Sequence, residues 1–164
     1  MLTGFKDTLE EIINTLSEHG LVANVTDREG RFFLNIEEMM CDPGFGCDNV
    51  VLDIFFDEHE RVLFIGLLRF PSNKRKEGIG SIIVEKIKDY AREHHFFIYL
   101  DAWNESQPFW KKHEFSHVYF DFNFFEIMGW SPDGLDVKEE WETHKRDQTG
   151  LWKFVMDEHP PRKV

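Results

Sequence analysis

A short basic loop followed by two glycines is the segment best suited to do chemistry. Lys74, Arg75 and Lys76 precede Gly78 and Gly80, and an amphipathic run begins at those glycines. A helix N-terminus carries unpaired N–H donors and about half a unit of positive charge, and glycine lets a phosphate come close to the backbone. The segment therefore predicts a site for a polyphosphate-bearing ligand. It is neither a Walker loop nor the dinucleotide-binding fingerprint, and taken alone it is also typical of an ordinary helix-initiating turn.

The elements that must position this loop are a strand before it and a helix after it. Residues 61–70 read as a strand with Gly66 in its middle, which indicates a bulge. Residues 96–100 read as a second short buried strand, so the three elements form a parallel unit with a right-handed crossover. The helix between them has one apolar stripe at three- and four-residue spacing, formed by Ile79, Ile82, Ile83, Ile87, Tyr90 and Ala91.

The stretch from Leu68 to Phe115 resembles the core of the GNAT N-acetyltransferase superfamily. Residues 75–80 match the family's Gln/Arg-x-x-Gly-x-Gly/Ala pyrophosphate loop without a gap, and Leu68 and Phe70 match the strand-end pair whose backbone pairs with the pantetheine arm. Asn104 matches the Asn that often begins the next helix. By this resemblance the residues that bind acetyl-CoA, the co-substrate, are Leu68, Phe70, Arg75, Lys76, Glu77, Gly78, Ile79, Gly80, Ser81, Asn104 and Trp110.

The resemblance also implies a fold. We expect an α/β (α+β) chain with a central mixed, twisted sheet of six to seven strands flanked by helices. All 164 residues would form one domain, with residues 61–115 as its acyl-CoA-binding core. In this family a bulge near Gly66 splays two parallel strands apart, and the thioester lies between them.

The rest of the chain supplies the remaining elements. Periodicity predicts a helix over residues 5–18 and strands over residues 21–26, 31–36, 50–56 and 115–120. Residues 39–49, rich in Gly, Pro and Asp, read as a loop, and residues 151–156 fit the family's closing strand. This leaves residues 121–150 as an extended connection rich in aromatic residues. It is either a lid over the acceptor pocket or a hydrophobic plug or dimer contact.

The activity implied by the resemblance is acetyl transfer from acetyl-CoA to an amine of a small molecule or a protein, by direct attack in a ternary complex. The amine must lose a proton, and a backbone N–H at the end of the 61–70 strand, that of Phe70 or a neighbour, would stabilise the oxyanion. Asp101, at the end of the 96–100 strand, is our first choice for the base. Asp53 and Asp57 are alternatives, and each of the three can equally be a surface carboxylate.

The acid is where the sequence departs from the family. Trp110 stands where the family places a tyrosine, and an indole donates a hydrogen bond but transfers no proton. Trp110 can therefore line the site of the CoA sulfur, while water, His113 or Tyr119 would supply the proton. Glu114 replaces the family's glycine before the strand aromatic, so that turn is expected to differ. His94 and His95 end the crossover helix and are interpreted as structural.

Composition excludes several classes of partner. The net charge of −12 argues against nucleic acid and against an anionic membrane surface, and it mildly favours a cationic acceptor. No apolar run is long enough to span a bilayer. Cys41 and Cys47 read as free cytosolic thiols rather than a disulfide, and without a neighbouring histidine they make a poor metal site. We therefore expect a cytoplasmic protein without a metal.

Two other functions stay open. The first is a GNAT-fold module that binds acyl-CoA without transferring the acyl group, which the tryptophan at position 110 keeps in contention. The second is an unrelated protein that binds a phosphate ligand or a partner. Acyl-CoA binding separates the second from the other interpretations, and thiol release in the presence of amines separates an enzyme from a binding module.

Overall fold

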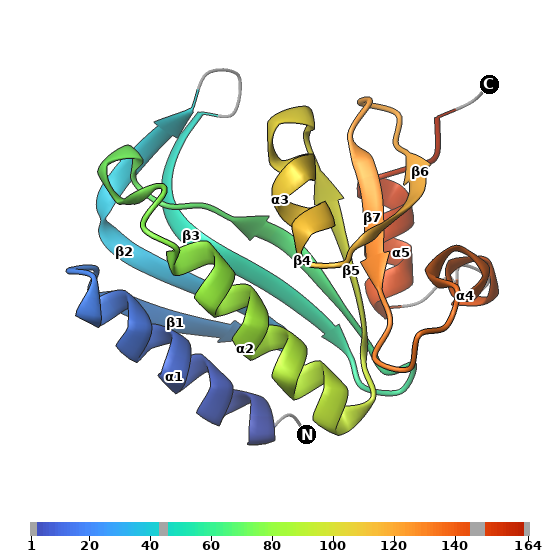
Figure 1. Cartoon of the computed structure of the whole chain (residues 1–164), viewed down its shortest axis with the longest axis horizontal. Coiled ribbons are helices and arrows are strands. Elements are labelled where there is room, and N and C mark those ends of the chain that lie inside the picture. The colour runs from blue at the N-terminus through green and yellow to red at the C-terminus, as the bar shows by residue number, and fades with distance from the viewer. Residues whose placement is uncertain (1–2, 43–45, 145–149, 163–164) are drawn as a thin grey trace. The chain divides into compact units, whose positions relative to one another are not determined.

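The computed structural model describes residues 3–42, 46–144 and 150–162 of the chain, and its elements form a mixed α/β fold (Figure 1). Among these residues, seven strands form one mixed sheet in the order β1-β2-β3-β4-β5-β7-β6. The sheet is the mixed arrangement that we expected, and the β4–α2–β5 segment is its parallel unit. The strands are β1 (Ala23–Arg28), β2 (Arg31–Asp42), β3 (Gly46–Asp57), β4 (Val62–Leu68), β5 (Phe97–Ala102), β6 (Ser116–Phe120) and β7 (Glu126–Trp130). The helices are α1 (Thr3–Glu18), α2 (Ile79–His94), α3 (Gln107–Lys112), α4 (Val137–His144) and α5 (Gly150–Glu158), with short 3₁₀ turns η1 (Ser72–Lys74) and η2 (Asn104–Ser106).

Contacts group the chain into two compact units. Unit 1 consists of Met1–Phe55 and Gly66–Tyr90, and unit 2 consists of Phe56–Ile65 and Ala91–Val164. No helix in the described ranges is long and apolar enough to cross a membrane.

Unit 1 is an antiparallel meander covered by two helices. Strand β1 pairs with β2 from Ala23↔Ile36 to Arg28↔Arg31, and β2 pairs in turn with β3. Helices α1 and α2 lie side by side (Figure 1), and Phe5 of α1 is buried with its ring 5.6 Å from that of Phe32 and 5.0 Å from that of Tyr90. The apolar stripe of α1 therefore faces the sheet, as its helical spacing predicted.

The segment predicted as a loop over residues 39–49 is strand at both its ends, so that prediction was wrong there, and residues 43–45 lie outside the described residues. Strand β2 continues to Asp42 and β3 begins at Gly46. Cys41 lies opposite Cys47 in this register with a Cα–Cα distance of 4.1 Å, and the two form a disulfide. The interpretation of both cysteines as free thiols was therefore wrong. The cytoplasmic assignment loses that part of its support, since disulfides are rare in the cytosol.

Helix α2 buries a stripe that differs slightly from the predicted one. Ile79, Ile83 and Ile87 are buried as expected, but the side chain of Ile82 is 40% exposed and Val84 is buried in its place. At about 100° per residue, Ile82 lies well away from the centre of the stripe that those four buried residues define, while Val84 lies inside it. The prediction of a buried stripe on α2 was thus correct, but the prediction that it includes Ile82 was wrong.

Unit 2 is built on a parallel pair extended by antiparallel strands. Residues 62–65 of β4 pair with residues 97–100 of β5, and the paired residues stop one position before Gly66. Strand β7 pairs antiparallel with both β5 and β6. Gly129 on β7 is required at this position because a Cβ there would lie 2.7 Å from the ring of Tyr99.

The part of the chain predicted as an extended connection contains regular elements, so its description as a connection was wrong. Residues 121–150 include β7 and α4, and the predicted closing strand at 151–156 lies within α5. A short apolar run does not distinguish a strand from a buried helix, which explains the error. Trp141 of α4 is buried, with its ring 4.9 Å from that of Tyr99 and 5.3 Å from that of Tyr119. The lid and dimer interpretations stay predictions.

Candidate functional site

The glycine loop of unit 1 opens α2 in the way that a phosphate site requires. Gly78 has a φ of +82°, in the left-handed region, and its carbonyl accepts the N–H of Ile82 at 3.2 Å. Gly78 is therefore the N-cap of α2, and the N–H groups of Ile79 and Gly80 in the first turn have no acceptor within the helix. A Cβ on Gly78 would meet nothing within 4 Å, so the approach to this backbone is open.

The three cations of this loop have different surroundings. Arg75 Nε donates to the carbonyl of Phe70 at 3.0 Å, so this side chain folds back and closes the loop. Lys76 has a φ of +67° and is exposed. Lys74 Nζ lies 3.5 Å from the position of a Cβ on Gly20, beside the C-terminal end of α1, where a helix dipole favours positive charge. We call residues 70–81, the candidate phosphate-binding segment, the phosphate loop.

The strand end that leads into the phosphate loop is held by Arg69. Its N–H donates to the carbonyl of Val51 at 2.9 Å, and its guanidinium forms an ion pair with Asp48. Leu68 and Phe70, on either side, are half-buried. Unit 1 thus brings together nine of the predicted acetyl-CoA contacts, namely Leu68, Phe70, Arg75, Lys76, Glu77, Gly78, Ile79, Gly80 and Ser81, with the side chain of Ile79 buried in the core.

The two other predicted contacts lie in unit 2. Asn104 begins η2, and its Oδ1 accepts Gln107 Nε2 at 3.3 Å. Trp110 is buried, with its ring 5.0 Å from that of Phe109 and 5.3 Å from that of Phe115. Most of the indole surface is therefore used in packing.

The predicted proton donors of unit 2 are both engaged. His113 is buried, with its ring 4.8 Å from that of Phe109. The Tyr119 hydroxyl donates to the carbonyl of His159 at 2.6 Å, and burial, with Asp121 and Asp101 nearby, raises the pKa of this phenol above its ordinary value. A raised pKa makes the hydroxyl a weaker acid.

Asp101 lies in a buried cluster. It is near the C-terminal end of β5, its side chain is only 6% exposed, and Oδ2 forms an ion pair with Nδ1 of His159. Its other oxygen, Oδ1, is buried and has no hydrogen-bond partner. Asp121 Oδ2 lies 3.4 Å from the same His159 nitrogen. The expected solvated carboxylate is therefore a buried one, and we call Asp101, Asp121 and His159 the His159 cluster.

Asp121 is fixed by the turn that follows β6. Its Oδ1 accepts the backbone N–H groups of Asn123 and Phe125, each at 2.9 Å, and the residue is fully buried. Its second oxygen is left to face His159. The orientation of the Asp121 carboxylate is thus fixed by the backbone of its own turn and does not depend on the imidazole.

Burial and charge act together on the pKa values of the His159 cluster. Burial raises the pKa of Asp101, although the hydrogen bond and the charge of His159 partly oppose this. Burial alone would lower the pKa of His159, but the hydrogen bond and the charge of Asp101, with those of Asp121, raise it overall. The cluster therefore holds protons more tightly than its isolated groups would.

One nitrogen and two carboxylate oxygens within 4.8 Å of one another are also a donor set that a divalent cation can take. Here, however, Nδ1 of His159 faces both carboxylates as a hydrogen-bond donor would. A ligating nitrogen must instead be unprotonated, so an ion pair accounts for these contacts and we assign no metal to them.

The alternative bases have structural partners. Arg31 donates to both oxygens of Asp53, at 3.0 and 2.8 Å, and Asp57 Oδ1 accepts the N–H of Glu60 at 3.0 Å. His95 Nδ1 lies 3.5 Å from an oxygen of Asp133 at the surface. These contacts agree with structural roles.

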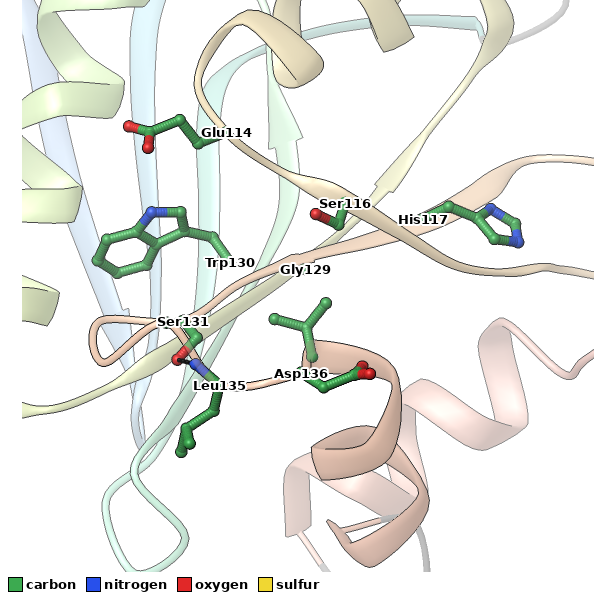
Figure 2. Close-up of a pocket in the computed structure, with 10 residues that line it drawn as sticks. Glu114, Ser116, His117, Gly129, Trp130, Ser131, Leu135 and Asp136 are labelled. Carbon is green, nitrogen blue, oxygen red and sulfur yellow. Dashed lines mark hydrogen bonds between the residues drawn. The ribbon is translucent and has the colours of Figure 1, made fainter.

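A separate surface pocket of about 530 Å³ lies in unit 2 (Figure 2). Glu114 and Trp130 line one part of it, and Leu135 and Asp136 line another. Asp101 and His159 are not among its lining residues. The pocket is thus distinct from the His159 cluster.

Sequence reasoning missed His159 and Asp121. His159 follows a segment that was interpreted as a strand, and no local pattern marks it as a partner of Asp101. Asp121 had a signal, because an Asp that opens the run Asp-Phe-Asn-Phe is typical of a side-chain-stabilised turn. That signal predicts the turn but does not predict that Asp121 contacts the His159 ring.

Comparison with known proteins gives only distant matches. No family model and no curated protein matches the sequence. Solved structures that are similar include Tetrahymena GCN5, at 14% identity over 63% of this chain and 69% of the other, with a TM-score of 0.46. Ard1 from Thermoplasma volcanium is 16% identical over 73% and 76%, with a TM-score of 0.44. The Bacillus subtilis N-acetyltransferase YlbP, in complex with coenzyme A, is 22% identical over 62% and 68%, with a TM-score of 0.39. Similarities of this size assign neither an activity nor a substrate to this chain.

Proposed function

We propose that this chain is an N-acetyltransferase that binds acetyl-CoA and transfers its acetyl group to an amine. The observation that carries the proposal is the conformation of Gly78. The residue lies at the position that the superfamily's pyrophosphate motif requires, and it caps α2 with a φ of +82° that a side chain would disfavour. The phosphate loop then offers a pyrophosphate the N–H groups of Ile79 and Gly80, which have no acceptor within the helix, and nearby cations.

The reaction requires a base for the amine, a donor for the oxyanion and a proton for the departing thiolate, and this chain has a candidate group for the first two. The backbone N–H of Phe70, at the end of β4, is the proposed oxyanion donor. The buried carboxylate of Asp101 belongs to the proposed proton-accepting site, together with the imidazole that contacts it. Protonation of the departing thiolate falls to water, because the pKa of Tyr119 is raised and its hydroxyl is bonded to a carbonyl.

A calorimetric titration with acetyl-CoA tests the binding step, with dephospho-CoA and ATP as controls. We expect a dissociation constant of about 1 μM, equivalent to about −8 kcal/mol. Weaker binding of dephospho-CoA would show that the 3′-phosphate is also recognised. No heat of binding from a folded sample would overturn the proposal.

A second candidate is a module that binds acyl-CoA without transferring the acyl group. It is favoured by Trp110, which replaces the family's proton donor and contacts the rings of Phe109 and Phe115. Release of the CoA thiol in the presence of a panel of primary amines distinguishes the two. Thiol release that depends on an amine supports the enzyme, and binding without release supports the module.

A further inference from the structure

His159 is fixed from several elements of unit 2. It follows the last residue of α5, and its N–H donates to the carbonyl of Val155 at 2.7 Å. Its own carbonyl accepts the Tyr119 hydroxyl from β6, and its ring lies 5.4 Å from that of Phe64 on β4. Backbone and ring are thus both held in place, as a side chain with one required orientation must be.

The two nitrogens of this ring have different surroundings. Nδ1 faces Oδ2 of Asp101 and Oδ2 of Asp121, and both oxygens can only accept a hydrogen bond when ionised. Nδ1 therefore carries the proton. Nε2 has no hydrogen-bond partner among the described residues. This nitrogen is not buried, and the side chain is 20% exposed, so Nε2 faces solvent.

Asp101 itself is poorly placed to take a proton from a ligand. Its side chain is 6% exposed, Oδ2 is engaged with His159, and Oδ1 is buried. A base must come within hydrogen-bond reach of the proton that it removes, directly or through one water. The accessible basic atom of the His159 cluster is therefore Nε2 and not a carboxylate oxygen.

We propose that Nε2 of His159 accepts the proton from the amine, and that Asp101 and Asp121 are positioning residues that hold Nδ1–H and stabilise the imidazolium. This assignment rests on the proposed function and changes the role of Asp101 within it. The arrangement is a carboxylate–histidine pair in which a second carboxylate, that of Asp121, faces the same ring nitrogen. A base oriented by a third group is a recurring way to activate a nucleophile.

The proton balance of the proposed step is complete. Neutral His159 takes one proton from the ammonium form of the acceptor, and the freed amine attacks the thioester carbon. The new C–N bond forms as the C–S bond breaks, and the nitrogen loses its second proton as the amide forms. This second proton passes to water, which protonates the departing CoA thiolate. The imidazolium releases the first proton to solvent, so that one proton is released overall and His159 is neutral again. No oxidant or reductant is required.

The pH dependence follows from the groups that face the ring. These are Asp101 on β5 and Asp121 after β6. The Tyr119 hydroxyl on β6 is bonded to the backbone carbonyl of His159, and Asp157 and Glu158 on α5 are exposed. The two carboxylates favour the imidazolium, so kcat should rise with pH through an apparent pKa above 6.5, the ordinary value for histidine. Replacing Asp101 by Asn removes one of these charges, so the rising limb should move to lower pH.

The test combines kinetics with a titration that needs no activity. Wild type, His159→Gln, Asp101→Asn and the control His59→Gln, whose imidazole is almost fully exposed, are compared. We expect His159→Gln to lower kcat by about 100-fold or more and to remove the rising limb, with acetyl-CoA affinity unchanged. In ¹⁵N-labelled wild-type protein, NMR should show His159 protonated at Nδ1 when neutral, with a pKa above 6.5 that falls in Asp101→Asn.

The outcomes separate this inference from the proposed function. If the wild type binds no acetyl-CoA, or binds it and releases no thiol with any amine, the transferase proposal fails and this inference fails with it. If the wild type is active and His159→Gln keeps its kcat and its rising limb, only the assignment of His159 is overturned. A neutral ring protonated at Nε2 would also overturn it. If the melting temperature of His159→Gln is well below that of the wild type, His159→Asn is used in its place. The inference then requires that His159→Asn also lose the rising limb of the pH profile of kcat.

Discussion

The phosphate loop is formed by backbone, whereas the His159 cluster is formed by side chains. In the loop, one left-handed glycine and the start of α2 present N–H groups, and residues 70–81 are continuous in the chain. In the cluster, three side chains from β5, the turn after β6 and the end of α5 meet in a buried place. The loop is therefore sensitive to backbone conformation and tolerant of changes elsewhere. The cluster is sensitive to any of its three members and to pH.

The largest effect should come from removing the carboxylate that is fixed on both oxygens. Asp121→Ala leaves the N–H groups of Asn123 and Phe125 without their acceptor and deprives His159 of a charge. We expect the free energy of unfolding to fall by about 3 kcal/mol, measured by urea denaturation. Asp133→Ala, which breaks an exposed pair with His95, should cost at most about 0.5 kcal/mol. Equal losses in the two variants would show that the cluster is not a buried network.

The loop should respond to backbone strain instead. Gly78→Val places a β-branched residue at a φ of +82°, so the turn must change and the first-turn N–H groups lose their alignment. We expect acetyl-CoA affinity to fall by about 100-fold, about 2.7 kcal/mol, measured by calorimetry. The matched control is Gly134→Val, at a φ of +68° with equally open surroundings, which should be strained to a similar degree and bind normally. Unchanged affinity in Gly78→Val would remove the loop from the site.

The pH dependence of stability should belong to the cluster and not to the loop. The pKa of His159 is raised in the folded protein, so the folded state binds more protons than the unfolded state above about pH 6.5. This contribution to stability is fully present below that pH and is lost as the pH rises through the folded value. As the pH is raised from about 6 to about 8.5, the urea concentration at the midpoint of unfolding should therefore fall less in His159→Gln than in wild type. His59→Gln should retain the wild-type slope, and an identical slope in all three proteins would argue against a paired imidazole.

The smallest effect is expected at Glu114, a residue with a positive φ that lies outside both the phosphate loop and the His159 cluster. Glu114 has a φ of +72°, in the left-handed region that favours glycine, so its side chain strains this turn. Glu114→Gly should relieve this strain and raise the free energy of unfolding by about 0.5 kcal/mol after the entropic cost of glycine. Glu105→Gly, at a position without a positive φ, should lower it. Acetyl-CoA affinity should be unchanged in both, since neither residue is one of the predicted acetyl-CoA contacts.

What could be predicted from the sequence follows the same division. The strand and the helix on either side of the phosphate loop are local elements, and periodicity predicted both, while the role of the loop itself stays a prediction from a six-residue motif. The His159 cluster depends on contacts between residues up to 58 positions apart, which no local pattern records. Asp101 was selected because it ends a strand, but its burial and its partner were not foreseen. The helix at 150–158 was misread because its short apolar run fits two kinds of element.

The disulfide that joins β2 to β3 has a practical consequence for enzymology. Assays that follow acetyl transfer through the liberated CoA sulfhydryl read any other reactive sulfur as product. With Cys41 and Cys47 joined, and no further cysteine in the chain, the oxidised protein contributes no such background. A reducing buffer would add two reactive groups per molecule. The colour reaction is therefore best run without reductant, after a mass measurement has shown the oxidised form.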